Sequence, residues 1–517
     1  MKKLKVVLRW TGRTLLVLLA TLALFILEEN LRGRIMLSRY KAELRAKGEK
    51  LTLAELNLPE VPKEGNGAFE FLATTEELTA ISKADPLWSY GLSVMRFASA
   101  GCAVVLHQKE NLVDRRPRPQ PPSSKRSSEM GRGRQPEAPR PLPTCSWDEL
   151  SNDVAAARNV LDKAKDAARQ PVLRADLNYV QGFPKHWPDP VKIWRLTDWL
   201  SASAFEALHR RNLDVALENI TAISDSTRLF KDTREPVLQT VRLSTVNTGL
   251  QVTWDALQTE GWTDEQLAKM QESWQRDGCL PDLVSCLEWD RARCAQAYNR
   301  DTLKDLLDGL KLMSYWREDM QEGRQYRLDT SLLTAHWLIW RAAWFEQSQL
   351  RTLRLWSKSL DDARNVAKQK SWAVWPERPK WRWTVYGFLR WMFYDRWRRL
   401  VDDTGYDCDL EMQRTIQYET QQEMTVAAIA LKRFHLRTGS FPASLSVLVP
   451  EFLPELPHDW MDGKPLRYRL NADRTFTLYS VGENGVDNGG DPNSQQPTGS
   501  FQMWYAPDAV WPQAASE

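Results

Sequence analysis

The sequence lacks the short motifs by which most cofactor-binding and catalytic sites are recognised. It contains no P-loop, no GxGxxG or GxSxG pattern, no HExxH motif and no CxxC pair. Its six histidines are too dispersed to indicate a metal site or a catalytic triad. These absences exclude a sequence-evident nucleotide, zinc or nucleophile site. A glycan hydrolase stays open as an alternative, because its carboxylates leave no short motif.

Cysteine is equally sparse and shows no metal-type spacing. Of the six cysteines, Cys286 and Cys294 fall in one expected helix. Such a helix separates them by ~12 Å along its axis, which is too far for a disulfide. The other four are scattered along the chain: Cys102, Cys145, Cys279 and Cys408. We therefore expect buried free thiols.

The chain has little net charge, and what it has is unevenly distributed. The total is +3, whereas residues 1–13 and residues 114–144 each carry +5, so the remainder stands at −7. The folded parts are therefore expected to be mildly acidic. This distribution disfavours nucleic acid as a partner.

The clearest targeting signal lies at the N-terminus. Five Lys and Arg residues in the basic segment 1–13 precede an apolar run at residues 14–27, and charged residues follow at once. As a helix the run measures about 21 Å, short of the ~30 Å hydrocarbon core, so it spans only if flanking residues contribute and Arg9 and Arg13 snorkel. No small-residue cleavage site follows the run.

These features predict an uncleaved signal anchor. Residues 1–13 are expected in the cytoplasm, and residues 14–28 are expected to cross the bacterial inner membrane once, which places the bulk of the chain in the periplasm. A cleaved signal peptide or a buried helix is the alternative interpretation.

Beyond the anchor, composition divides the chain into further segments. Residues 29–113 are expected to form a charged helical stalk followed by a mixed segment. Residues 114–144 hold eight prolines and no aromatic residue, and such a segment buries too little surface to offset its chain entropy. We expect a disordered or polyproline-like insert there.

Residues 145–404 are predicted to form a helical domain. One apolar stripe runs from Trp194 to Leu208, a break follows at Arg211 and Asn212, and a second stripe begins at Leu213. A capping box begins at Thr263. The pattern favours antiparallel helix pairs stacked as a bundle or small solenoid, without a strict repeat period.

Within that region, residues 371–400 hold six tryptophans and seven Lys or Arg residues against two acids. This composition suits an interfacial membrane helix, since Trp and Arg favour the headgroup region. It equally suits a glycan- or polyanion-binding surface, or a packed helix whose arginines stack on tryptophans. The three interpretations remain open.

Residues 405–517 show a different pattern, typical of a small α+β domain. A long helix is expected over residues 411–435, ended by Gly439 and Pro442. Alternating residues at 466–470 and 475–481 predict two antiparallel strands. The fold class is therefore mainly α, with an N-terminal anchor, a helical bundle or solenoid-like domain, and a small α+β domain.

Three consecutive stretches carry a family resemblance. They are ALKRFHLRTGSFPASLSVLV, PEFLPELPHDWMDGKPLRYRL and FTLYSVGENGVDNGGD. In this order, after a long helix, they resemble the globular part of the major pseudopilin of type II secretion systems. The resemblance covers residues 409–495. The chain departs from the family because no glycine-plus-Phe processing site precedes residue 14, and nearly 400 residues separate the anchor from the module.

The resemblance implies a calcium site in the last stretch. Matched by position, its ligands would be the Leu478 carbonyl, Ser480, Asn484, Asp487 and Asp491. These are hard oxygen ligands of the kind that Ca²⁺ prefers. Asn484 replaces an Asp of the family, which removes one negative charge. An ion-free turn, in which Asn and Asp cap the local backbone, is the alternative.

The sequence thus leads to two hypotheses of different classes. The first is a membrane-anchored envelope protein with a binding or scaffolding role and protein partners, in a secretion-type or surface assembly. The second is an envelope hydrolase acting on glycans, with the tryptophan-rich segment as a sugar platform. A cleft with two opposed carboxylates beside tryptophans would favour the hydrolase.

Overall fold

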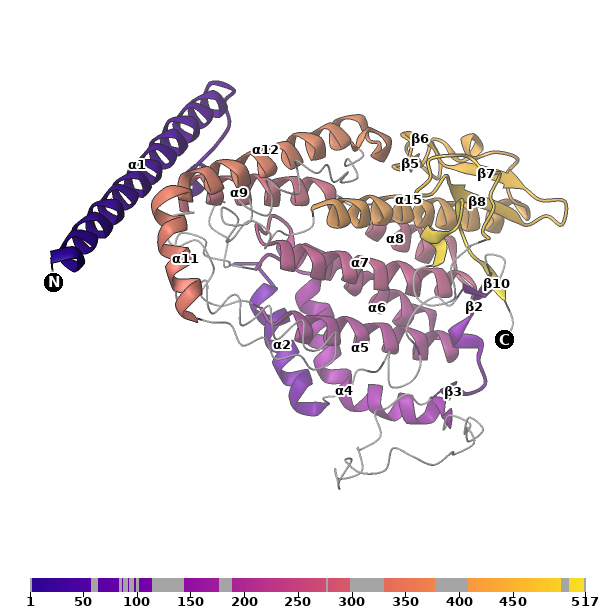
Figure 1. Ribbon diagram of the computed structural model, residues 1–517. Helices are drawn as coiled ribbons and strands as arrows, with labels where there is room; N and C mark the ends of the chain where they lie inside the picture. Colours follow the sequence, from indigo (N-terminus) through magenta and orange to yellow (C-terminus); the bar gives the residue numbers. More distant parts are fainter. Residues whose placement is uncertain are drawn as a thin grey trace, which may run out of the picture.

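The computed structural model describes residues 2–56, 64–82, 86, 92, 97–98, 102–113, 144–175, 188–275, 278–297, 330–376, 408–493 and 502–515. Nearly all of the proline-rich segment 114–144 and most of the tryptophan-rich segment 371–400 lie outside these residues. The fold is mainly helical, as predicted, with a few short strands at residues 97–145 and 458–515 (Figure 1).

The helices are α1 (Lys2–Ala46), α2 (Ala68–Ile81), α4 (Trp147–Ala168), α5 (Pro190–His209), α6 (Leu213–Ser226), α7 (Pro236–Leu257), α8 (Asp264–Trp274), α9 (Leu280–Ala297), α11 (Thr330–Ala343), α12 (Phe345–Gln369) and α15 (Cys408–Thr438). The strands are β1 (Phe97–Ala98), β2 (Cys102–Val104), β3 (Leu112–Val113), β4 (Thr144–Cys145), β5 (His458–Asp459), β6 (Lys464–Pro465), β7 (Arg467–Leu470), β8 (Phe476–Ser480), β9 (Ala509–Val510) and β10 (Gln513–Ala515).

The helices stack in sequence order, as the paired apolar stripes predict. α4 packs on α5, and α5 packs on both α6 and α7. α7 in turn packs on α15. Figure 1 shows the result as successive layers of roughly aligned helices. The break between α5 and α6 falls at the predicted position. There Arg211 adopts a positive φ of 57°, and the Asn212 side chain accepts a hydrogen bond from the Val215 backbone N–H.

Capping residues fix where the helices begin. Ser146 starts α4 with a complete capping box through Glu149, and the box predicted at Thr263 starts α8 through Gln266. Pro281 lies in the first turn of α9. Proline is tolerated there because a first-turn N–H has no partner within the helix.

The long C-terminal helix is part of the same packed stack. α15 contacts α7 and α8, and one continuous apolar core includes residues from α2 through to Trp511. The buried Glu419 of α15 also accepts a hydrogen bond from the Leu280 backbone N–H at the start of α9 (2.9 Å). A carboxylate in this place satisfies an amide that lacks a partner within the helix and opposes the helix dipole.

The strands form small sheets at the end of the stack. The predicted hairpin is present as β7 and β8, which pair antiparallel, and β9 adds a third strand beside β8. The last strand, β10, pairs parallel with β2. The Trp254 indole N–H of α7 donates to the Pro512 carbonyl next to β10 (2.9 Å), which ties the chain's end to the helical core.

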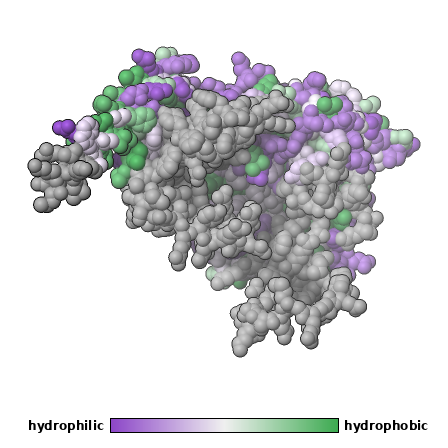
Figure 2. All heavy atoms as spheres, in the orientation of Figure 1, coloured by the Kyte–Doolittle hydropathy of each residue, from purple (hydrophilic) through white to green (hydrophobic). Residues whose placement is uncertain are grey.

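The two halves of the long N-terminal helix α1 differ in exposure: the first is exposed and apolar, and the second packs on the body. Residues from Trp10 to Leu24 are exposed and mostly apolar, and Figure 2 shows this hydrophobic surface concentrated at one end of the molecule. Farther along α1, residues at helical spacing face α12: Glu29, Gly33, Leu37 and Leu44 are all buried. The second half of α1 therefore packs on the body, where the sequence predicts a stalk.

The five cysteines whose side chains the structure describes form no disulfide with one another. Cys279, Cys286, Cys294 and Cys408 are buried, as predicted, and Cys102 is half-buried. Burial raises the pKa of the Cys279 and Cys294 thiols to about 12, so both stay protonated and unreactive at neutral pH.

Candidate functional site

The loop that carries the predicted calcium ligands lies between β8 and β9. Its backbone folds around one buried carboxylate, Asp508, which comes from the turn just before β9. The Asp508 carboxylate accepts hydrogen bonds from the backbone N–H groups of Asn488, Gly490 (2.8 Å) and Asp491 (3.0 Å). Positive φ at Gly489 and Gly490 allows successive N–H groups to point to the same side.

Two of the predicted ligands lie on β8, in the interior. The Leu478 carbonyl accepts a hydrogen bond from the Trp511 backbone N–H (2.8 Å). The Ser480 hydroxyl is buried and donates to Oδ1 of Asp459 (2.7 Å). Both groups therefore already have protein partners.

The other three predicted ligands lie on the loop itself. Asn484, Asp487 and Asp491 each accept a hydrogen bond from the backbone N–H two residues farther along, at 2.8, 3.0 and 3.0 Å. These are the local turns that the ion-free interpretation anticipates. Asp487 also accepts from the Tyr479 hydroxyl (3.0 Å) and lies 3.7 Å from the Arg467 guanidinium.

Among the described residues, no three His, Cys, Asp or Glu side chains converge as a metal-binding group. The predicted calcium ligands are of a different kind, because they include a backbone carbonyl, a hydroxyl and an amide oxygen. The calcium site stays a prediction.

Sequence reasoning missed the two carboxylates that organise this region. Asp459 is fully buried and accepts from the Ser480 hydroxyl and from the backbone N–H groups of Val481 and Met461. It also pairs with Arg467 (2.9 Å). Burial raises the pKa of Asp459. Asp508 is the single acidic residue in the apolar stretch 503–511, which is the one signal that could have marked it. Asp459 has no such signal, because Glu455 and Asp462 lie close to it in the sequence.

Replacing Asp508 with asparagine is expected to loosen this loop. An amide has one acceptor oxygen and presents N–H donors, so it cannot receive three backbone N–H groups, and a lost buried acceptor costs about 1–3 kcal/mol. Hydrogen exchange at Asn488, Gly490 and Asp491 should accelerate. Asp473→Asn, in an exposed turn, is the control, and equal exchange in both variants would contradict the assignment.

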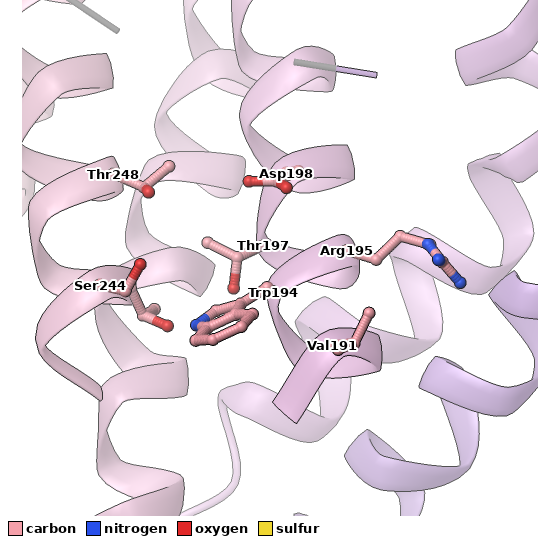
Figure 3. A pocket seen from close by; sticks show the side chains of 8 residues that line it. Val191, Trp194, Arg195, Thr197, Asp198, Ser244 and Thr248 are labelled. Atoms are coloured by element: carbon pink, nitrogen blue, oxygen red, sulfur yellow. The ribbon is translucent and has the colours of Figure 1, made fainter. Parts of the chain in front are cut away.

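A cavity of about 300 Å³ lies between α5 and α7 (Figure 3). The Trp194 ring forms one wall and is 36% exposed, while Arg195 points away from it. Polar groups from both helices line the rest. They are Thr197 and Asp198 on α5 and Ser244, Thr245 and Thr248 on α7.

A second cavity, of about 550 Å³, lies between α2 and α4. Its acidic residues are Glu70, Glu77 and Asp166, and Glu77 is paired with Lys163 at 2.8 Å. Among the described lining residues, this cavity has no tryptophan and the α5–α7 cavity has one carboxylate, Asp198. On these residues, neither cavity combines opposed carboxylates with a tryptophan.

No family model, curated protein or solved structure matches this chain. The pseudopilin resemblance consequently rests on the order of its motifs alone.

One buried polar network has the connectivity of a catalytic triad. The Asp255 carboxylate contacts Nδ1 of His107, and the Thr259 hydroxyl lies 2.8 Å from Nε2 of the same ring. All three side chains are buried, and neither cavity described above reaches them. Asp255 also accepts from the Leu106 backbone N–H (2.8 Å). The network therefore fastens residues 106–107 to the end of α7, and neither of the two cavities leads a substrate to it.

Proposed function

We propose that this chain is a single-pass, membrane-anchored bacterial envelope protein with a binding or scaffolding role, with its bulk in the periplasm, in a secretion-type or surface assembly. One observation carries the proposal. α1 contains one stretch long and apolar enough to cross a membrane, and its apolar residues are exposed. Exposed leucines in such number are unfavourable in water and favourable in a bilayer.

The way α1 joins the body supports a fixed anchor. The buried Glu29 carboxylate accepts from the indole N–H of Trp344 (2.9 Å) and from the Gln347 amide (2.8 Å). Gly33 sits against Gln347 so closely that an added Cβ would lie 2.9 Å from its side chain. The membrane helix therefore continues into the body without a flexible joint, as suits a scaffold held near the bilayer.

The anchor is tested by alkaline extraction of membranes from cells that express the full chain. The natural chain should remain in the pellet, and protease added to spheroplasts should reach its bulk. A Leu18→Arg and Leu22→Arg double variant should be released, because each central arginine disfavours insertion by about 2.5–3.5 kcal/mol. The matched control is Val447→Arg with Leu456→Arg, which places the same charges on the body. Release of the natural chain would refute the proposal.

We further propose that residues 409–495 form a pseudopilin-like module with a calcium-binding loop. The order of α15, the β7–β8 hairpin and the glycine-rich loop supports it, together with the motifs already quoted. Calcium would have to draw Asp487 and Asp491 away from their local turns. Burial of Ser480 and the Asn484 replacement both predict weak binding.

Calcium should raise the unfolding temperature of the full chain in detergent, since a ligand that binds only the folded state stabilises it. Asp487→Ala and Asp491→Ala should each abolish this shift, whereas Asp473→Ala, in the neighbouring turn, should preserve it. Isothermal titration with Ca²⁺ gives the second readout. No heat and no shift in the natural chain would rule out the site.

Glycan recognition at the α5–α7 cavity is the second candidate function. The exposed Trp194 ring favours it, because the electron-rich face of an indole suits the C–H face of a sugar ring. Asp198 and the hydroxyls of Ser244 and Thr248 supply acceptors and donors for sugar hydroxyls. The cavity volume lies at the lower end for ligand pockets and fits a small saccharide.

This candidate is tested with soluble peptidoglycan fragments and the detergent-solubilised chain. Binding should be lost in Trp194→Ala and retained in Trp460→Ala, a half-buried tryptophan outside both the cavity and the segment 371–400. Release of cleaved fragments would instead favour the hydrolase alternative. Equal binding by both variants would place the glycan elsewhere.

A further inference from the structure

Helix α11 carries large apolar side chains that remain exposed on the described part of the molecule. Leu338 is 56% exposed and Ile339 42% exposed, side by side on the helix. The Arg341 guanidinium lies over the neighbouring Trp337 ring, 5.1 Å from its centroid. We call Trp337, Leu338, Ile339 and Arg341 the α11 face. The helix contains no acidic residue.

The α11 face has a fixed position beside the membrane helix. The Phe25 ring of α1 contacts Trp344 edge-on at 6.2 Å, and Ile26 packs on the cluster formed by Trp340, Ala343 and Trp344. The Asn30 amide donates to the Ala342 carbonyl at the end of α11 (2.9 Å). These contacts join α11 to α1 at the last turn of the apolar run of α1.

This junction sets the depth of α11 relative to a bilayer. Phe25 and Ile26 belong to the apolar run that is expected to fill the hydrocarbon core, while Glu29 and Arg32 follow one turn later in the polar zone. The end of α11 is therefore held at the level where hydrocarbon gives way to headgroups. An exposed leucine and isoleucine there would meet lipid rather than water.

The chemistry of the α11 face fits that location. Tryptophan is enriched at the membrane–water interface, where its ring is partly apolar and its N–H polar. Arginine without an acidic neighbour on the same helix is attracted to anionic headgroups. Leucine and isoleucine supply the apolar area that holds an interfacial helix in place.

We propose that α11 lies in the interface of the bilayer that α1 crosses, with Leu338 and Ile339 at the acyl boundary and Arg341 among the phosphates. This rests on the proposed membrane anchor. The protein would thus contact its membrane through two elements, which fixes how the body is tilted on the surface.

The experiment uses the full chain in vesicles of phosphatidylethanolamine and phosphatidylglycerol. An environment-sensitive fluorophore is attached at Leu338→Cys, at Leu18→Cys in the anchor, or at Val447→Cys on the body, where the natural side chains are all exposed. The natural chain is labelled in parallel to correct for its own cysteines. Lipids carrying a spin label near the headgroup and lipids carrying one along the acyl chain are included together, so that quenching reports contact with the bilayer at both depths.

We expect the label at position 338 to be quenched several-fold more than the label at 447. Strong quenching at 18 with equal, weak quenching at 338 and 447 would overturn the α11 proposal and leave the anchor standing. Weak quenching at all three would overturn both. A label at 338 that is shielded from water but not quenched by lipid would identify another protein, or a second copy, as the occupant and would also overturn it.

Discussion

A Glu235→Gln variant is expected to unfold at a clearly higher temperature than the natural chain at pH 8 and at nearly the same temperature at pH 4.5. Glu235 is buried at the start of α7. Burial, followed by repulsion from Asp290 of α9, raises its pKa from 4.5 to about 7, and Arg293 only partly offsets this.

The direction of the pH dependence is set by whether the folded or the unfolded chain holds the Glu235 proton. Between pH 4.5 and 7 the folded chain keeps Glu235 protonated while the unfolded chain has released that proton, so the free energy of unfolding falls as pH rises. Above pH 7 both states have released the proton, and the free energy of unfolding falls no further on account of Glu235. The rise in the Glu235 pKa from 4.5 to about 7 corresponds to a loss of about 3 kcal/mol in the free energy of unfolding. Glutamine does not titrate, so the Glu235→Gln variant does not lose this stability.

Thermal unfolding of both chains in detergent at several pH values checks this expectation. Glu423, whose pKa burial likewise raises to about 7, contributes the same trend in both chains and cancels in the comparison. Glu265→Gln is the matched control, because the Glu265 side chain is 79% exposed. A gain for Glu235→Gln that is equal at pH 4.5 and pH 8 would show that Glu235 does not titrate in this window.

Gly249→Ala is expected to destabilise the protein by about 2 kcal/mol, through overpacking of a filled site. Gly249 lies in the middle of α7, where alanine normally stabilises a helix by about 1 kcal/mol. Here an added Cβ would lie 2.5 Å from the buried Trp274 ring and 2.9 Å from the Ile223 side chain. The substitution therefore reverses the sign expected from helix propensity.

A double-mutant cycle separates the clash from any other effect. In a Trp274→Leu background the ring atoms that meet the new Cβ are gone and only the Ile223 contact remains, so Gly249→Ala should cost clearly less free energy. Gly12→Ala, in a helix with no atom within 4 Å of the added carbon, should not destabilise the protein. If Gly249→Ala costs the same free energy in both backgrounds, the Trp274 contact is not its cause.

Signals from residues close together in the sequence predicted the helix boundaries and the hairpin well. The break at Arg211 and Asn212, the capping box at Thr263 and the β7–β8 hairpin all occur where the sequence indicates them. Each depends on residues within a few positions of one another, so periodicity and turn chemistry suffice to find them.

The features that were missed depend on partners far away in the chain. Glu29 and Gly33 look like parts of a solvated helix, because the groups that bury them, Trp344 and Gln347, lie more than 300 residues later. The same holds for Asp508, whose importance comes from amides that a loop folds around it. The motif could indicate where the loop lies in the sequence. Only the fold shows which N–H groups its oxygens accept hydrogen bonds from.

The parallel pairing of β10 with β2 affects how the chain must be made. Its partners lie about 410 residues apart, so this pairing is among the most non-local contacts in the fold. β2 cannot gain this neighbour until residues 513–515 have been synthesised and have reached the same compartment. Until then β2 keeps an open edge of the kind that recruits other strands. A chain truncated before residue 513 would keep that edge for its whole lifetime.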